Sequence, residues 1–512
     1  MHVLMVAAEN DALPGAKVGG VADVVRDIPK ALAEQGCSVD VIIPDYGFGH
    51  LNRQHIGQLN VQYKGALHQL SVYKIESTQS GVYQFVISHH LFSDAGGAVY
   101  CNDAPGRPFA TDASKYALFN AAVCEGLLQG IFRRPDALHL HDWHSALVAV
   151  LIKYSARYKP LQAIHTAYTV HNLALQGIRP FKHDDSSLEA WFEDLTYDRY
   201  ELCDPRYSDC FNPMRSAINL ADKVHLVSPT YSQEVLKASN YEQGFFGGEG
   251  LERDLQNKAN ASNVVGILNG CEYTEIPAHN ETQHSLYNQI EQSLFIWMAT
   301  QTQVQSSHYI AHQRLQQFKS SKSTGPLITS VGRLTEQKVL LLAQQYDQTL
   351  MLDKVCELIA QFKGRLIILG SGDSDLEALF CKAMARNSNF LFLKGYAQGV
   401  GDTLYQLGDL FLMPSSFEPC GISQMLAMRA GQPCLVHSVG GLKDTVVHNE
   451  TGFCFTGDSL NKQNEALLST LESALSMHKK QPKQWLEIAK NAQSQRFSWD
   501  TVAQDYIKYL YR

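Results

Sequence analysis

Short runs of β-branched and aliphatic residues alternate with amphipathic stretches along most of this chain. Strands that are joined by crossover helices run parallel, because each helix returns the chain to the same end of the sheet. The alternation therefore predicts an α/β fold with two Rossmann-like, doubly wound domains. The predicted strands cover residues 3–7, 39–44, 138–140, 166–170 and 224–227 in the first half, and 327–331, 366–369, 390–393, 410–413 and 434–436 in the second.

Length and composition also favour two domains. The chain has 512 residues, which is more than the roughly 250 to 300 that one core serves. Residues 240–325 are rich in Asn, Gln, Ser and Gly with one helix-like interval near 287–318, so a boundary is expected near Gly266. The predicted domains are 1–265 and 266–495, facing each other across a cleft.

The last segment, 496–512, is predicted to be a closing helix that packs on the N-terminal domain. It begins at Ser498-Trp499-Asp500, a sequence typical of a helix start. Val502, Tyr506 and Leu510 then share one helical face, which needs an apolar surface to cover it.

Composition argues against several classes of partner. The net charge is −8 and no lysine or arginine cluster is present, so nucleic acid is not expected to bind. No apolar stretch reaches the ~18 to 20 residues that cross a bilayer, and the first residues lack a basic leader. The eleven cysteines are scattered without Cys-x-x-Cys pairs, which favours a reduced, cytoplasmic protein without a structural metal.

A glycine pair follows the first predicted strand, in Lys17-Val18-Gly19-Gly20-Val21-Ala22-Asp23. The residues after Gly20 carry an apolar helical face, so the glycines open a helix. Bare amides at a helix start suit a phosphate group, and Lys17 adds a mobile cation. The spacing matches neither the dinucleotide-binding motif nor the P-loop. The alternative is a glycine turn that serves only close packing.

Two histidine-bearing loops follow later strands of the first half. They are His141-Asp142-Trp143-His144 and Val170-His171-Asn172-Leu173, and both are expected at the same sheet edge as the glycine pair. No third residue stands at a ligand-like spacing, so hydrogen bonds to hydroxyl groups are favoured over a metal site. A buried core histidine remains the alternative for His171.

In the second half, Arg333-Leu334-Thr335-Glu336-Gln337-Lys338 follows a predicted strand. Arg333 and Lys338 bracket a helix start and can converge on one diphosphate, the guanidinium as a two-pronged donor and the ammonium as a compact charge. The alternative is a solvated helix end. Gly370-Ser371-Gly372-Asp373 is a further strand-to-helix turn, and Tyr396 can stack on a nucleobase or simply pack.

The loop Glu418-Pro419-Cys420-Gly421 comes after the apolar run 410–413 and the turn Pro414-Ser415-Ser416. It places a carboxylate at the carboxyl edge of a sheet, where open α/β folds bind ligands. A surface turn with a solvated glutamate is the alternative.

Taken in order, these loops resemble the bacterial glycogen synthase and plant starch synthase family. The resemblance also includes Val227-Ser228-Pro229-Thr230-Tyr231 and Gly266-Ile267-Leu268-Asn269-Gly270 and covers nearly the whole chain. It implies the GT-B fold, with donor groups supplied by both domains. It further implies transfer of glucose from ADP-glucose to the non-reducing 4-hydroxyl of an α-1,4-glucan such as glycogen, with retention of configuration.

By this resemblance, Glu418, His171, Arg333 and Lys338 would be catalytic. Arg333 and Lys338 would neutralise the leaving ADP in place of a metal, so no cofactor is implied beyond the donor substrate. Glu418 would contact the region of the glucose 3-hydroxyl, and His171 would lie beside the sugar ring.

The same resemblance assigns a set of substrate-binding residues. Lys17 and Gly20 would face the donor diphosphate, Asp23 and Asn269 the glucose hydroxyls, and Tyr396 the adenine. The complete set is Lys17, Gly19, Gly20, Asp23, Asp142, Asn269, Tyr396, Cys420, Gly421 and Ser423.

The chain also departs from the family pattern. Val339 replaces the usual glycine after Lys338, Ser416 and His437 stand where arginine is common, and residues 271–320 lack the Trp-Asn-Pro continuation. These departures leave open a catalytically weakened glucan-binding or regulatory protein, and a transferase that uses UDP-glucose or another acceptor. Leu426, where related sucrose- and trehalose-type enzymes carry a second glutamate, argues against those enzymes.

Overall fold

The computed structural model describes residues 1–76, 80–273, 281–321 and 323–512. They form two compact units: Met1–Ser239, Gly247–Gly270 and Ser498–Arg512 make the first, and Asn240–Phe246 and Cys271–Phe497 make the second. The first unit thus runs to Gly270 rather than to the expected 265, and a short segment before that point belongs to the second. No helix among the described residues is long and apolar enough to span a membrane.

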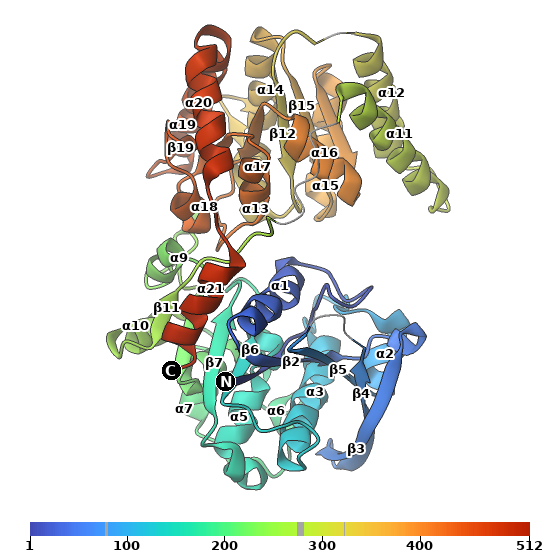
Figure 1. Cartoon of the computed structure of the whole chain (residues 1–512), viewed down its shortest axis with the longest axis vertical. Helices are drawn as coiled ribbons and strands as arrows, with labels where there is room; N and C mark the ends of the chain where they lie inside the picture. The colour runs from blue at the N-terminus through green and yellow to red at the C-terminus, as the bar shows by residue number, and fades with distance from the viewer. Residues whose placement is uncertain (77–79, 274–280, 322) are drawn as a thin grey trace. The chain divides into compact units, whose positions relative to one another are not determined.

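The first unit contains a nine-stranded sheet in the order β11-β10-β7-β6-β1-β2-β5-β4-β3 (Figure 1). Its strands from β11 to β5 in this order pair in parallel, as predicted, whereas β3 and β4 add an antiparallel hairpin. The bounds are β1 (His2–Val6), β2 (Ser38–Pro44), β3 (Arg53–Tyr63), β4 (Ala66–Ile75), β5 (Val82–Ser88), β6 (Ala137–His141), β7 (His165–Val170), β10 (Lys223–Leu226) and β11 (Val264–Gly266), with a separate pair β8 (Arg179–Pro180) and β9 (Cys210–Phe211).

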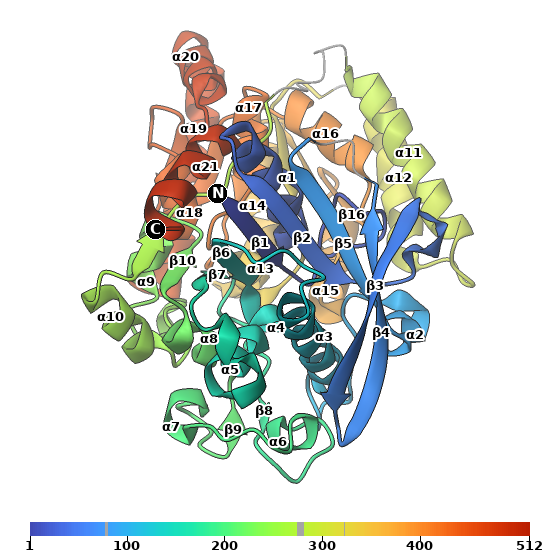
Figure 2. The ribbon, with the colours of Figure 1, turned by 60° about the horizontal axis from the view of Figure 1, so that its bottom comes forward.

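Helices cover both faces of this sheet (Figures 1 and 2). α1 and α21 lie side by side over one face, and α3 and α5 lie over the other. The helices are α1 (Gly20–Glu34), α2 (His90–Gly97), α3 (Ala110–Leu128), α4 (Asp142–Ser145), α5 (Leu147–Tyr154), α6 (Leu188–Trp191), α7 (Arg199–Leu202), α8 (Pro213–Leu220), α9 (Pro229–Glu234), α10 (Glu252–Asn260) and α21 (Trp499–Asp505).

The C-terminal segment packs within the first unit. Ser498 caps α21 by accepting a hydrogen bond from the Thr501 amide, and a π-helical turn, Tyr506–Leu510, continues it. Val502, Tyr506 and Leu510 are buried in the same core as the apolar face of α1. Burial of this face accounts for the return of the chain to the first sheet.

The second unit contains a six-stranded parallel sheet in the order β16-β15-β12-β17-β18-β19. Each strand predicted in this half is present, and β19 was not predicted. The strands are β12 (Leu327–Val331), β15 (Arg365–Gly370), β16 (Phe390–Lys394), β17 (Leu410–Met413), β18 (Cys434–His437) and β19 (Gly452–Phe455), with a small hairpin β13 (Gln345–Tyr346) and β14 (Thr349–Leu350).

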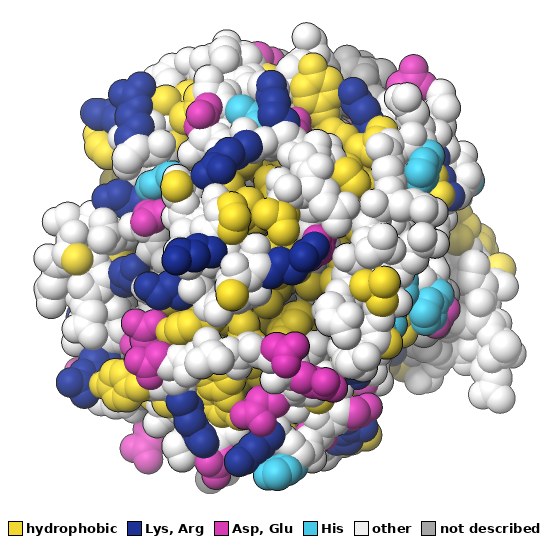
Figure 3. All heavy atoms as spheres, turned by 90° about the horizontal axis from the view of Figure 1, so that it is seen from below, with side chains coloured by type: hydrophobic (Ala, Val, Ile, Leu, Met, Phe, Trp, Pro, Cys, Tyr) yellow, Lys and Arg dark blue, Asp and Glu magenta, His cyan; other side chains and the backbone are white. Residues whose placement is uncertain are grey.

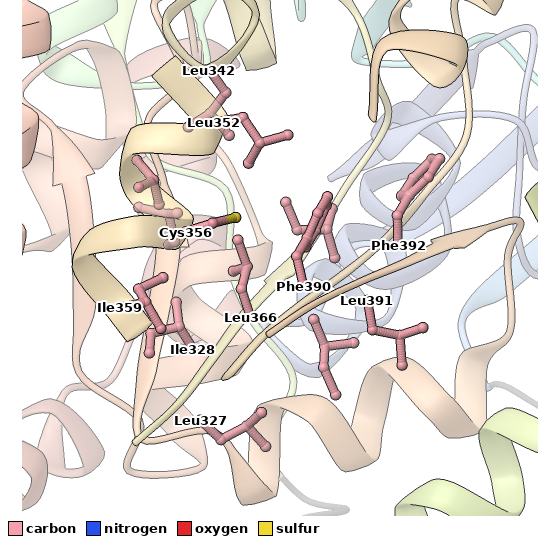
Figure 4. Close-up of a cluster of buried hydrophobic side chains, with 14 of the residues drawn as sticks. Leu327, Ile328, Leu342, Leu352, Cys356, Ile359, Leu366, Phe390, Leu391 and Phe392 are labelled. Carbon is pink, nitrogen blue, oxygen red and sulfur yellow. The ribbon is translucent and has the colours of Figure 1, made fainter. Parts of the chain in front are cut away.

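A continuous apolar core joins this sheet to its helices. Cys356 and Ile359 of α14 lie in one buried cluster with Leu366 of β15 and Phe390 of β16 (Figure 4). The helices are α11 (Gln283–Ala299), α12 (Ser306–Ser320), α13 (Glu336–Ala343), α14 (Met351–Gln361), α15 (Ser374–Arg386), α16 (Gln398–Leu407), α17 (Ser423–Arg429), α18 (Gly440–Thr445), α19 (Leu460–Lys480) and α20 (Pro482–Ser494).

The prediction of one helical interval over 287–318 is wrong, because two helices, α11 and α12, occupy it. α11 ends at the C-cap Thr300, and α12 begins after the extended Gln305. Thr300, Thr302 and Val304 are β-branched residues with low helix propensity, which favours the break.

Candidate active site

Both sheets reverse their strand order at a point where polar loops emerge. In the second unit, β15 and β16 lie on one side of β12, and β17 to β19 lie on the other. In the first unit, β2 lies on one side of β1, and β6, β7 and β10 lie on the other. Ligands of open α/β sheets bind outside the carboxyl ends of the strands at such switch points. Of the loops predicted from sequence, those after β1 and β6 flank the first switch point and those after β12 and β17 flank the second. The His171 loop follows β7, next to β6, and the loops at 370–373 and 396 follow β15 and β16.

At the switch point of the second unit, Lys338 and Glu418 form an ion pair. Lys338 Nζ in the first turn of α13 lies 2.6 Å from Glu418 Oε2 in the loop after β17. Ser415 Oγ donates a second hydrogen bond to the same carboxylate oxygen at 3.2 Å. Glu418 is only 5% exposed. The structure therefore brings together two of the residues predicted to be catalytic, and the cation compensates a buried carboxylate.

The backbone of the Glu418 loop is held from two sides. The amides of Ser416 and Phe417 donate to the Gln337 carbonyl at 2.9 and 3.2 Å, which ties the loop to α13. The amide of Gly441 donates to the Glu418 carbonyl at 3.1 Å, which ties it to α18. Sequence reasoning missed these supports, although the glycine pair at 440–441, shortly after the end of β18, is a signal for close backbone approach.

Two other predicted residues of the second unit are open to solvent. Arg333 follows β12, is exposed, and makes no ion pair with another described residue. Tyr396 follows the edge strand β16 and is 68% exposed. Two strands, β15 and β12, separate β16 from β17, so Tyr396 lies farther along the sheet edge from Glu418 than Lys338 does. A free guanidinium and an exposed ring are available to a ligand.

The remaining predicted residues of the second unit support the Glu418 loop. Cys420 is buried. Gly421 has φ +77°, a left-handed conformation that glycine adopts without strain. Ser423 begins α17 and is hydrogen-bonded to the Tyr405 hydroxyl. Cys420 and Gly421 thus fix the conformation of the loop, and Ser423 begins the helix that follows it.

In the first unit, an internal carboxylate occupies part of the glycine loop. The amides of Val18 and Gly19 both donate to Glu9 Oε2 at 2.6 Å, and Glu9 is 1% exposed. Lys17 Nζ pairs with Asp23 at 2.6 Å and with Asp11 at 3.1 Å. Sequence reasoning missed Glu9, which follows β1 after Ala7 and Ala8. The amides of this loop therefore bind an anionic oxygen, and two of them are occupied by the carboxylate of Glu9 from the same loop.

The segment at 141–144 holds the histidine loop at 170–173 in place. Asp142 has φ +52°, is buried, and accepts a hydrogen bond from the His171 amide at 2.8 Å. Burial raises the pKa of Asp142 to about 7, against the lowering effect of the His171 and Asn172 amides. The ring of His141 bonds to that of His171, with 3.0 Å between Nδ1 and Nε2. Asp142, predicted to bind substrate, contacts the main chain of His171.

Asn269, the other predicted residue of the first unit, is 5% exposed, and its Oδ1 is buried without a partner among the described residues.

The described ranges contain no group of three or more His, Cys, Asp or Glu residues arranged to hold a metal ion. On the face shown in Figure 3, Lys and Arg side chains lie singly or in small groups among neutral and acidic ones.

Five buried histidines with lowered pKa values predict an acid-sensitive first unit. Burial lowers the pKa of His139, His141 and His171 well below the ordinary value, that of His225 to about 4 and that of His144 to about 3. In the unfolded chain each titrates near pH ~6.5, so below this pH the unfolded state binds more protons and stability falls. We expect a loss of about 1.4 kcal/mol per pH unit for each such histidine below pH ~6.5. The raised pKa of Asp142 acts in the opposite direction between about pH 4 and 7.

Unfolding of the His225→Gln variant between pH 7 and 5 tests this expectation. Glutamine keeps an N–H donor for the Ile267 carbonyl, which His225 Nε2 contacts at 2.9 Å, but it does not titrate. The slope of unfolding free energy against pH should therefore be shallower than in the parent by about 1.4 kcal/mol per pH unit, which corresponds to one proton. Parallel slopes would contradict the assignment of His225 as a neutral buried group.

Comparison with known proteins identifies the family. A model described as the starch synthase catalytic domain matches residues 2–257, and one described as glycosyl transferases group 1 matches residues 312–492. A glycogen synthase of Streptococcus equi subsp. equi is 33% identical over 521 residues, covering 99% of this chain and 98% of the relative. The chain belongs to the glycogen synthase family. A glycogen synthase of Streptococcus mutans is 31% identical and covers 100% of this chain and 99% of its own.

Solved structures agree with the family assignment. The catalytic domain of starch synthase IV from Arabidopsis thaliana, bound to ADP and acarbose, has a TM-score of 0.77 and 26% identity, covering 99% of this chain and 98% of its own. A sucrose-phosphate synthase from Thermosynechococcus elongatus, at 16% identity and a TM-score of 0.52 with 99% and 97% coverage, shares the fold. This member of the glycogen synthase family is therefore a glycosyltransferase with the GT-B fold of two Rossmann-like domains.

Proposed function

We propose that this protein is a retaining glucosyltransferase of glycogen synthesis. It moves glucose from ADP-glucose to the non-reducing 4-hydroxyl of an α-1,4-glucan. The observation that carries the proposal is the match to glycogen synthases over 99% of the chain. The choice of ADP-glucose is supported by the similar starch synthase IV, which was solved with ADP bound.

The second unit would bind the nucleotide sugar. Breaking the bond between glucose and diphosphate creates an anionic leaving group and an oxocarbenium-like sugar centre. Lys338 and Arg333 would lie against the diphosphate, where negative charge grows, and no divalent cation is then needed. Glu418 would contact the sugar near its 3-hydroxyl, and the exposed ring of Tyr396 would stack on the adenine.

The first unit would supply the acceptor side and complete the donor site. The amide of Gly20, at the start of α1, and the ammonium of Lys17 would face the diphosphate. His171 would lie beside the sugar ring, and Asp23 and Asn269 would bind its hydroxyls. The acceptor hydroxyl would approach from the side that the diphosphate leaves, which preserves the anomeric configuration. The eleven cysteines form no disulfide among the described residues, which is in keeping with a cytoplasmic enzyme.

Purified protein incubated with ADP-glucose and glycogen tests the proposal. We expect release of ADP and growth of the glucan, slower release of UDP from UDP-glucose, and no loss of rate in EDTA. No nucleotide release with either donor would overturn it. Tight glycogen binding with a trace turnover that Glu418→Ala leaves unchanged would instead support the glucan-binding or regulatory alternative.

A further inference from the structure

Three imidazole rings form a stack at the carboxyl ends of β6 and β7. The ring centroids of His139 and His141 are 4.2 Å apart, and those of His141 and His171 are 5.3 Å apart, with interplanar angles of 29° and 22°. His139 and His141 are almost fully buried, whereas His171 at the end of the stack keeps 9% of its surface exposed. The stack therefore connects the interior of the first sheet to a residue at its ligand-binding edge.

The contact between His141 and His171 restricts where their protons lie. Only one proton can lie between His141 Nδ1 and His171 Nε2, which are 3.0 Å apart. If His171 supplied it, neutral His141 would carry its own proton on Nε2, an atom that is buried without a partner among the described residues. An unpaired buried donor costs about 1–3 kcal/mol, and orphaned N–H groups are rarer in proteins than under-used acceptors. His141 Nδ1–H is therefore the donor.

His139, on the other side of His141, is fixed by a separate chain of hydrogen bonds. His225 Nε2 lies 2.9 Å from the Ile267 carbonyl, which can only accept, so His225 Nδ1 accepts, from Thr169 Oγ1 at 2.9 Å as the nearer donor and from the Tyr506 hydroxyl at 3.3 Å. Thr169 Oγ1 then accepts from His139 Nε2 at 2.6 Å, and His139 Nδ1 accepts from the Tyr511 hydroxyl at 2.8 Å. His141 thus stacks on a ring whose orientation is set by the C-terminal segment.

We propose that His141 is a positioning residue that fixes the tautomer of His171. With His171 Nε2 accepting from His141, the proton of His171 lies on Nδ1, and no described residue accepts a hydrogen bond from this atom. His171 then offers an N–H donor to an oxygen of the substrate. Asp142 Oδ1 restrains the same residue by its main-chain amide at 2.8 Å. The role in catalysis rests on the proposed function, whereas the tautomer does not.

Two-bond ¹H–¹⁵N correlation spectra of the full-length protein labelled with ¹⁵N-histidine test the tautomer directly. The His171 signals are assigned by their loss in His171→Gln. We expect the Nδ1–H pattern for His171 in the parent. His141→Asn, whose amide nitrogen stands near the position of Nδ1, should retain it, and His141→Leu should shift it toward Nε2–H. An Nε2–H pattern in the parent, or an unchanged His171 pattern in His141→Leu, would overturn the proposal.

Kinetics provide the second readout. His141→Leu should lower kcat by about 3- to 10-fold, the effect of one misdirected hydrogen bond, and His141→Asn should restore most of it. Equal kcat in the two variants would overturn the catalytic role. If the parent shows the Nδ1–H tautomer but releases no nucleotide from any donor, the proposed function fails and the tautomer assignment stands.

Discussion

Replacing Lys338 with alanine is expected to lower kcat by about 100- to 1,000-fold, the usual effect of removing one preorganised group that stabilises developing charge. The substitution removes the cation proposed to face the leaving diphosphate. It also leaves Glu418, 5% exposed, without the ammonium that now lies 2.6 Å away. Glycogen affinity should change little, because Lys338 is assigned to the donor. Steady-state kinetics with ADP-glucose and affinity electrophoresis in glycogen measure the two quantities.

Two further substitutions separate charge from position. Lys338→Arg keeps the positive charge but changes the geometry, so it should retain more activity than Lys338→Ala. Lys382→Ala, on the exposed surface of α15, removes a lysine that makes no ion pair with another described residue and should leave kcat unchanged. An equal loss of turnover and glycogen affinity in Lys338→Ala would refute the phosphate role.

Much of the fold was predictable because the relevant signals are local. Each of the predicted strands is present, since alternation of buried strands and amphipathic helices is a property of short windows. The hairpin of β3 and β4 was not predicted. Its turn, Lys64-Gly65, has φ of +50° and +69°, as a type I′ turn requires, but it lacks the Asn-Gly or Asp-Gly sequence by which such turns are recognised.

The candidate site was predictable as residue types at strand ends but not as pairs. Which loops meet depends on strand order, which no local pattern contains. The sequence therefore pointed to Lys338 and Glu418 separately, and the structure joins them. Glu9 was missed for a different reason: its partners, the amides of Val18 and Gly19, lie in the same connection between β1 and α1, and how that connection folds back on itself is not visible in a local pattern.

Replacing Gly440 with alanine is the second change expected to have a large effect. Gly440 has φ +43°, and a Cβ atom there would lie 2.1 Å from the Glu418 carbonyl oxygen. The left-handed conformation alone costs about 1–2 kcal/mol for an L-residue. The steric overlap is relieved only by moving α18 or the Glu418 loop, and a shift of about 1 Å at a reacting group can lower the rate by about 100-fold. Both kcat and the midpoint of thermal unfolding should fall.

The matched control is Gly106→Ala. A Cβ atom at Gly106 has no neighbour within 4 Å, and this glycine lacks a positive φ. The control should therefore keep the parent kcat and thermal midpoint. A Gly440→Ala variant that is destabilised but retains the parent kcat would show that the position of Glu418 does not depend on α18. Loss of kcat at an unchanged KM for glycogen would instead place the damage at the donor side. The added Cβ atom overlaps the main chain of Glu418, whose carboxylate is assigned to the donor sugar.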